Sequence, residues 1–258
     1  MPKPYISITD FANRSQVMKM MDVFVASGCL QVKRMLGVGI MISRKTLNGL
    51  SSKWTDVWPR HDQIAGIFID HPLAFNTLHY ADYDGIDVYN NLVVATRLGG
   101  VHMKALQLDM IWPDAGALYE YRQKYSDIQI ILQVNSRSLE QVDNDPLKLH
   151  ATLEKYRVFL DYVLLDLSMG CGKGMQSEIL LPMVKLIAEE RDDLGIVVAG
   201  GLGPETMDLV APIVAEHPQI SFCAQGQLRA SGNALDPIDW DRAAEYLKQA
   251  IILLLTQR

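Results

Sequence analysis

The stretch 161-DYVLLDLSMGCGKGM-175 runs from an apolar segment into a carboxylate, Asp166, and then into a loop of glycines around Lys173. Four apolar residues before Asp166 are typical of a buried strand, and residues 176–191 continue with a helical period. The stretch therefore predicts a strand, a glycine loop and a helix in that order. In a parallel sheet made of such units, Asp166 stands at the carboxyl end of its strand, beside a loop with few side chains to cover its backbone.

The same unit recurs along the chain. Short runs rich in Val, Ile and Leu alternate with longer segments of helical period, a pattern typical of repeated βα units. Eight strands are expected, at residues 4–9, 35–43, 64–70, 104–109, 128–134, 161–166, 195–200 and 219–225. Helices are expected at residues 15–27, 55–63, 73–82, 88–98, 114–126, 146–160, 176–191, 204–216 and 239–257. Eight strand–helix units in one chain of 258 residues favour a single-domain (β/α)8 TIM barrel over an open doubly wound sheet.

One part of this pattern is irregular. Two helical stretches, at 73–82 and 88–98, separate the third expected strand from the fourth. We therefore expect an extra helix or lid within about residues 71–100.

Composition narrows the kinds of partner. The chain is 49% hydrophobic and 21% charged, enough to bury a large core, and its net charge is −6 with scattered Lys and Arg, which excludes a nucleic-acid surface. Three widely spaced cysteines are typical of reduced thiols, and runs such as 251-IILLL-255 are too short to cross a membrane. We expect a cytoplasmic protein that binds neither nucleic acid nor membrane, and homo-oligomerisation stays open.

Polar residues follow most of the expected strands. In a (β/α)8 barrel the chemistry lies at the carboxyl ends of the strands. The residues there are Thr9 and Asp10, Ser43 and Arg44, Asp70 and His71, Asp109, Gln133 and Asn135, Asp166, Gly200 and Gly201, and Gln225. Contact with water explains any single member, but Asp166 is fixed between an apolar strand and a glycine loop, which suits it to proton transfer.

A second signal lies in 197-VVAGGLGPET-206, where a strand ends in Gly200 and Gly201 and a helix begins at Pro204. Glycines let backbone N–H groups approach an anion, and a helix N-terminus adds partial positive charge. The segment 224-AQGQLRASGN-233 supplies Gly226 after the eighth strand. Loops after strands seven and eight commonly share a phosphate site in these barrels, so we predict that a small phosphorylated metabolite binds here.

Three segments carry a family resemblance: 164-LLD-166, 170-GCGK-173 and 200-GGLGPE-205. In order and spacing they resemble the sixth-strand and seventh-strand motifs of phosphoribosylanthranilate isomerase. The resemblance implies an Amadori rearrangement, in which an acid opens the sugar ring and a base removes the C2 proton, with no metal or organic cofactor. It assigns the acid to Asp166 and the phosphate site to Gly172, Lys173, Gly200, Gly201 and Gly226.

Two fainter matches concern the substrate, and one departure concerns the base. The segment 107-QLD-109 stands where the family has Gln-Leu-His, and Arg44 follows the second strand where the family has an arginine for the substrate carboxylate. Asp109 and Arg44 are thus candidate substrate contacts. The family's base is a cysteine in the first strand, where 5-YISIT-9 offers Ile6 or, after a slip of one residue, Ser7. Ser7 and Asp10 are the candidate bases.

Other functions stay open. His71 and His79, with Asp70, form a small cluster, but their spacing of eight does not favour a metal site, and none is expected. We predict an isomerase acting on a small sugar phosphate. The alternative is a non-catalytic barrel that senses or binds a phosphometabolite. An aldolase or epimerase is a weaker alternative, since Lys104 lies at the start of its strand, away from the chemistry.

Overall fold

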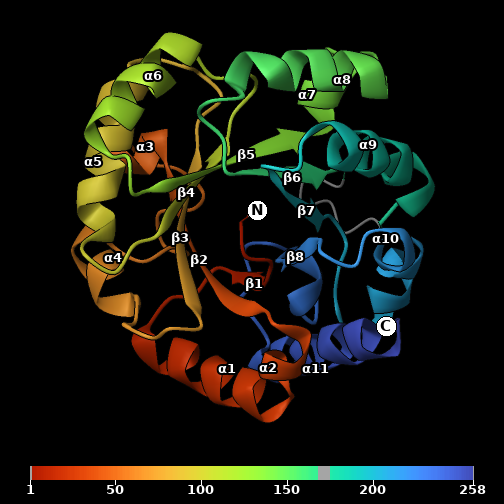
Figure 1. Cartoon of the computed structure of the whole chain (residues 1–258). Helices are drawn as coiled ribbons and strands as arrows, with labels where there is room; N and C mark the ends of the chain where they lie inside the picture. The colour runs from red at the N-terminus through yellow and green to blue at the C-terminus, as the bar shows by residue number, and fades with distance from the viewer. Residues whose placement is uncertain (1, 168–174, 258) are drawn as a thin grey trace.

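The computed structural model describes residues 2–167 and 175–257, and its eight strands form one closed parallel barrel. The strands follow one another in chain order, and β1 pairs with β8 in the register Ser7↔Cys223 to close the ring. Figure 1 shows the helices arranged around the outside of the strands. The strands are β1 Tyr5–Thr9, β2 Met35–Ser43, β3 Ala74–Ala81, β4 Ala105–Asp109, β5 Gln129–Asn135, β6 Tyr162–Asp166, β7 Gly195–Ala199 and β8 Ser221–Ala224. The predicted (β/α)8 barrel is confirmed.

The helices fill the intervals between the strands. They are α1 Arg14–Ala26, α2 Cys29–Val32, α3 Arg44–Leu47, α4 His61–Ile67, α5 Val88–Gly99, α6 Ala115–Lys124, α7 Ser136–Glu140, α8 Pro146–Leu153, α9 Ser177–Glu190, α10 Ala211–Glu216 and α11 Trp240–Thr256, with 3₁₀ turns η1 Glu154–Tyr156, η2 Pro204–Val210 and η3 Gly226–Leu228. Side-chain caps fix several helix starts. The Asn13 side chain accepts from the Gln16 N–H at 3.1 Å and begins α1, and Asp239 accepts from the Asp241 N–H at 3.0 Å and begins α11.

Alternation along the strands produces two separate cores. Residues such as Ile6, Ile8 and Val38 face outward and pack under the helices. The inward residues form a second cluster, in which the rings of Tyr5, Phe75 and Tyr162 lie with centroids 4.9–5.5 Å apart. This aromatic cluster fills the barrel at the amino-terminal end of the strands, so the space for a ligand lies at the other end.

The third strand is not where the sequence analysis expects it. Residues 64–70, predicted as a strand, contain the end of α4, and residues 74–81, predicted as a helix, form β3. Ile64 and Ile67 are buried three residues apart, a spacing that places both on one face of a helix. In β3 the residues alternate between the helix side and the barrel interior, and the register pairs His79 with Gln107 of β4. The strand prediction for 64–70 is wrong because a short apolar run fits both structures.

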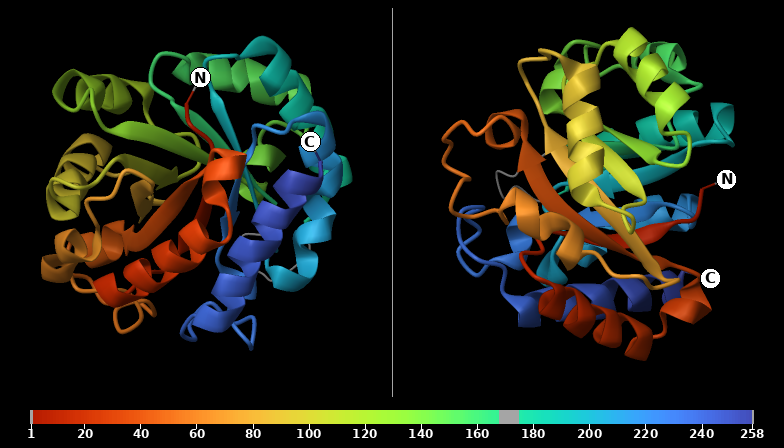
Figure 2. Two further views of the ribbon diagram at one scale, coloured as in Figure 1. Left: turned by 60° about the horizontal axis from the view of Figure 1, so that its bottom comes forward. Right: turned by 90° about the vertical axis from the view of Figure 1, so that its left-hand side faces the viewer.

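The irregular part of the barrel lies between β2 and β3. Residues 71–100, where we expect an extra helix or lid, contain β3 and α5, the ordinary strand and helix of one unit. Residues 44–60 contain the short helix α3 and a turn before α4. Figure 2 (right) shows this orange segment at the end of the barrel opposite the two termini. Among the described residues, no helix is both long and apolar enough to cross a membrane.

Candidate active site

A cavity of ≈ 470 Å³ opens at the carboxyl ends of the strands. This volume lies within the range of about 300–1,000 Å³ that is usual for small-molecule sites. Polar residues from β3 to β6 form its floor, and two loop segments form its sides. The lining residues are Met41, Lys53, Trp54, Trp58, His79, Ala81, Tyr83, Asp109, Gln133, Asn135, Asp166, Gln225, Gly232, Asn233, Ala234 and Leu235. We call this space the central cavity.

A row of hydrogen-bonded side chains crosses the floor of the central cavity. The Gln107 amide nitrogen Nε2 donates to Gln133 Oε1 at 2.8 Å, and Gln133 Nε2 donates to Asp166 Oδ2 at 3.2 Å. Gln107 Nε2 also lies 3.3 Å from His79 Nδ1. The four side chains come from the neighbouring strands β3 to β6, and each points into the barrel. The row holds Asp166 in place at the end of β6.

His79 is neutral in this arrangement. Burial is the largest effect and lowers the pKa of His79 below its ordinary value, although the nearby Asp109 carboxylate acts in the opposite direction. An amide nitrogen can only donate, so the His79 nitrogen that meets Gln107 Nε2 accepts and carries no proton. Both observations indicate an uncharged imidazole at neutral pH.

Asp109 is the second carboxylate of the site. The Tyr83 hydroxyl lies 2.7 Å from both carboxylate oxygens, and Asn135 Nδ2 donates to Oδ1 at 3.1 Å. His79 Nε2 lies 4.0 Å from Asp109 Oδ2. Burial, together with the Asp109 carboxylate, raises the pKa of Tyr83 well above its ordinary range, so Tyr83 stays a donor. Asp109 therefore accepts hydrogen bonds from two side chains of the site.

The predicted phosphate glycines lie together beside Asp166. Gly200, Gly201 and Gly226 line a narrow pocket of ≈ 40 Å³ with Asp166, and this pocket also contacts His79 and Gln133 of the central cavity. Gly200 and Gly201 have φ of +99° and +74°, a backbone conformation that costs free energy in residues other than glycine. The amides of these three glycines make no hydrogen bond to another described residue. Gly172 and Lys173 lie outside the described residues.

Gly203, by contrast, does not offer its amide to a ligand. Its N–H donates to Thr206 Oγ1 at 2.9 Å, and Thr206 Oγ1 donates to the Gly201 carbonyl oxygen at 2.7 Å. The threonine therefore fixes the turn that presents Gly201.

The two candidate bases are both engaged by protein groups. Ser7 lies inside β1 and its hydroxyl donates to the Gly37 carbonyl oxygen at 3.3 Å. Asp10 Oδ2 accepts from Arg229 Nη2 at 2.5 Å and from Gln225 Nε2 at 2.8 Å. The Asp10 and Arg229 side chains are 6% and 1% exposed, so this is a buried ion pair. Neither residue lines the central cavity, and the structure therefore does not bring them to the reacting centre.

Of the two cysteines among the described residues, Cys223 on β8 lies beside the first strand. Cys223 pairs with Ser7 in the barrel register and its sulfur lies 3.4 Å from Thr9 Oγ1. Burial raises the pKa of the Cys223 thiol to about 11, so the thiol is protonated at neutral pH. It cannot replace the thiolate base of the family at this pH.

Arg44 faces a neighbouring space and is already paired. It forms ion pairs with Asp84 and with Asp82, whose side chain is fully buried, and Arg44 Nε lies 3.6 Å from Asp82 Oδ1. Arg44 lines a side cavity with Lys45 and Asp84 and does not line the central cavity.

Sequence reasoning missed His79, Tyr83 and Gln107 as site residues. His79 and Tyr83 belong to the segment that was predicted as helix, so their side chains could not be assigned to the barrel interior. A signal was present in 74-AFNTLHYA-81, because aromatic residues and Thr77 within a short run favour a strand. Gln107 was overlooked because it precedes the strand end by two residues, and residues i and i+2 of a strand face the same side.

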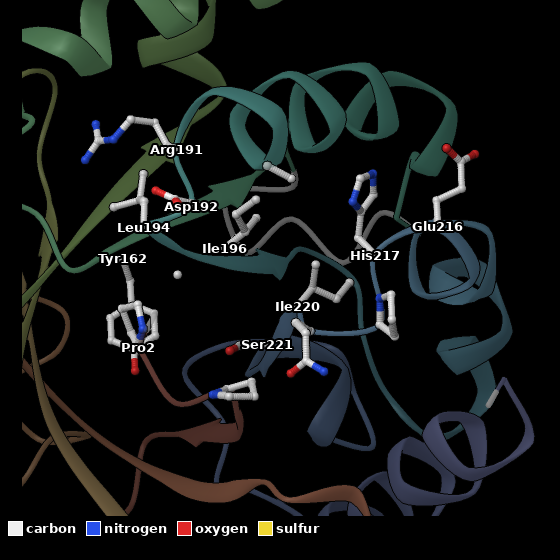
Figure 3. Close-up of a pocket in the computed structure, with 15 residues that line it drawn as sticks. Pro2, Tyr162, Arg191, Asp192, Leu194, Ile196, Glu216, His217, Ile220 and Ser221 are labelled. Carbon is white, nitrogen blue, oxygen red and sulfur yellow. The ribbon is translucent and has the colours of Figure 1, made fainter.

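A further cavity of ≈ 210 Å³ lies at the amino-terminal ends of β6, β7 and β8. Figure 3 shows apolar side chains such as Leu194, Ile196 and Ile220 around it, with Arg191 and Glu216 extending away at its edges. The Arg191 guanidinium is bound to Asp193 and Glu154. This end of a (β/α)8 barrel serves stability, and we do not assign it to the candidate site.

Comparison with known proteins identifies the fold. No protein-family model and no curated protein matches the sequence. Among solved structures, N-(5'-phosphoribosyl)anthranilate isomerase from Pyrococcus furiosus is 13% identical with a TM-score of 0.60, over 96% of this chain and 98% of that one. TrpF from Jonesia denitrificans is 12% identical with a TM-score of 0.55, over 96% of each chain. Tryptophan synthase subunit alpha from Legionella pneumophila is 13% identical with a TM-score of 0.54, over 98% of this chain and 92% of that one. The resemblance to phosphoribosylanthranilate isomerase is confirmed for the fold. Sequence identities this low do not show that the activity is shared.

Proposed function

We propose that the chain is an enzyme that isomerises a small phosphorylated sugar by acid/base proton transfer of the Amadori type. One observation carries the proposal: two carboxylates, Asp166 and Asp109, line one cavity, and the narrow pocket with the glycine amides adjoins only Asp166. An anion at Gly200, Gly201 and Gly226 would sit at a site of three backbone donors. The phosphate end of a substrate would then lie next to Asp166 and the rest of the sugar would extend toward Asp109.

This orientation assigns a role to each carboxylate. In a ring-closed sugar 5-phosphate, the ring oxygen is bonded to C4, next to the carbon that carries the phosphate, whereas C2 lies farther away. Asp166 on the phosphate side would protonate the ring oxygen as the bond between that oxygen and C1 breaks, leaving an iminium at C1 of an aminoaldose. Asp109 on the far side, hydrogen-bonded to Tyr83 and Asn135, would accept the C2 proton.

The remaining step restores neutrality. The electron pair of the broken C2–H bond forms the C1=C2 bond of an enolamine and neutralises the iminium. The enolamine becomes the ketose phosphate when its C2 hydroxyl loses a proton and C1 gains one. Asp109 then gives its proton to solvent and Asp166 takes one from solvent, so both groups return to their starting states. The overall reaction is an isomerisation without oxidant or reductant. In this scheme neutral His79 and the Gln107–Gln133 row position the two acids.

A non-catalytic barrel that binds a phosphometabolite is the second candidate. This candidate is favoured because neither Ser7 nor Cys223 can replace the first-strand cysteine base of phosphoribosylanthranilate isomerase. The Ser7 hydroxyl donates to Gly37, and the Cys223 thiol stays protonated. Such a protein would need only the glycine amides and the polar floor.

Asp166→Asn and Asp109→Asn distinguish the two candidates. A panel of aldose phosphates and their N-substituted glycosylamines would be offered to the wild type and both variants. Binding is measured by calorimetry and turnover by loss of the C2 proton signal in D₂O. General acid/base groups usually contribute about 10²–10⁴ in rate, so we expect each variant to lose at least about 100-fold in turnover while it still binds.

Asp241→Asn serves as the control, because that carboxylate is exposed on α11 and does not line the cavity. Binding without turnover in the wild type as well as in the variants would favour the non-catalytic candidate. If neither inorganic phosphate nor any member of the panel binds, both candidates are wrong.

A further inference from the structure

We infer that the substrate carries an uncharged apolar or planar group at C1, bound against Met41, Trp54, Trp58 and Leu235. The inference rests on the proposed function and names the class of substrate that the same site takes. It starts from the contrast between the two ends of the central cavity. The end near β6 to β8 is made of glycine backbone and polar side chains, whereas the end near β2 is apolar.

The apolar end of the cavity is a preformed surface, which we call the apolar wall. Trp54 and Trp58 stack with ring centroids 4.9 Å apart and planes 4° from parallel. Trp58 and Met41 are only 9% and 6% exposed, so the wall is held by packing before any ligand arrives. Leu235 also lines the cavity, from the loop after β8, and its side chain is 39% exposed. A flat or apolar group between these residues would bury surface that water now contacts.

The geometry of the sugar directs one group toward this wall. With the phosphate at Gly200, Gly201 and Gly226 and the ring oxygen near Asp166, C1 and its substituent point away from the glycines. That direction leads past Asp109 to the β2 side of the cavity. A bare sugar phosphate would leave the wall in contact with water.

The charges around the wall favour an uncharged group over a carboxylate. Arg44, the residue that would take a substrate carboxylate by resemblance, is neutralised by Asp82 and Asp84 and lines a different cavity. Lys53 lines the central cavity, but its ammonium is held over the Trp54 ring at 4.9 Å. Asp109, the proposed base, adds a carboxylate to the same cavity and would repel a second anion on that side of the substrate.

Three stable probes test the inference by calorimetry: ribitol 5-phosphate, 1-anilino-1-deoxyribitol 5-phosphate, and the latter with a carboxylate on the ring. One further methylene in an apolar pocket is usually worth about 10–200-fold in discrimination, so we expect the anilino probe to bind at least about tenfold more tightly than ribitol 5-phosphate. The carboxylated probe should bind no more tightly than the anilino probe.

Leu235→Ala and Trp54→Ala should each reduce the ratio of the anilino and ribitol affinities at least about threefold, because each removes part of the wall. Leu209→Ala is the matched control, since Leu209 is similarly exposed at 37% and lies outside the cavity, and it should leave the ratio unchanged.

Equal affinities for ribitol 5-phosphate and the anilino probe would overturn the inference, and so would tighter binding of the carboxylated probe. Failure of the proposed function looks different. In that case ribitol 5-phosphate does not bind at all. If the anilino probe still binds, the apolar wall is a binding site although the proposed function is wrong. If no probe binds, the inference is wrong as well.

Discussion

At the scale of single residues, the site depends on which groups carry charge. Asp109 accepts hydrogen bonds from Tyr83 and Asn135, whereas burial lowers the pKa of His79, which lies 4.0 Å from it, and keeps the imidazole neutral. The resemblance predicted Asp166 as the acid, and the structure brings it together with Asp109 in one cavity. The sequence alone could not predict Tyr83 as the partner of Asp109, because Tyr83 follows β3, which lies where the sequence predicts a helix.

The neutral His79 predicts a dependence of stability on pH. Its pKa is lower in the folded chain than in the unfolded chain, so below the unfolded value of about 6.5 the unfolded chain binds more protons. The contribution of His79 is therefore complete at higher pH, and stability is lost as the pH falls below about 6.5.

We expect the free energy of unfolding in urea to fall between pH 7.5 and pH 5.5 by a larger amount in the wild type than in His79→Gln. The glutamine keeps an amide beside Gln107 but cannot titrate, while the neighbouring carboxyl groups of Asp10, Asp109 and Asp166 are present in both proteins. An identical fall in the two proteins would contradict a buried neutral His79.

At the scale of elements, the sequence predicted seven of the eight strands close to their observed positions because buried parallel strands read as short apolar runs. The exception, 64-IAGIFID-70, has the same composition and belongs largely to α4. Only its packing distinguishes it, since Ile64 and Ile67 face one side. Composition could not reveal that residues 44–60, and not 71–100, provide the wall beside the site.

The loop after β1 is tied to the loop after β8 by the Asp10–Arg229 pair. Asp10 has φ of +86°, a conformation that costs a residue other than glycine of order 1–3 kcal/mol. Arg229 compensates by holding three segments, since it also donates to the Gln225 carbonyl oxygen at 2.8 Å and to the Asp236 carbonyl oxygen at 2.6 Å. The pair therefore positions Gly226 and the segment that carries Leu235.

Removing one partner of this pair should be costly. Asp10→Asn leaves the buried Arg229 guanidinium without its counter-charge, and we expect the free energy of unfolding in urea to fall by about 3–5 kcal/mol. Asp241→Asn breaks the exposed pair with Lys19 and should change stability little. If the two variants are equally stable, the Asp10–Arg229 pair does not hold the rim as we describe.

At the scale of the whole molecule, the barrel divides into an aromatic plug and a polar floor. Tyr5, Phe75 and Tyr162 fill the amino-terminal end, and His79, Gln107, Gln133 and Asp166 form the layer above them. The fold follows from the repeated pattern and is shared with proteins only 11–13% identical. The activity does not follow from the fold, because it depends on side chains that the pattern leaves free to vary.

A crystal structure with ribitol 5-phosphate tests the central claim most directly. We predict phosphate oxygens within hydrogen-bond distance of at least two of the amides of Gly200, Gly201 and Gly226, with C4 nearer Asp166 and C2 nearer Asp109. A phosphate bound elsewhere, or a carbon chain that reaches neither carboxylate, would contradict the account.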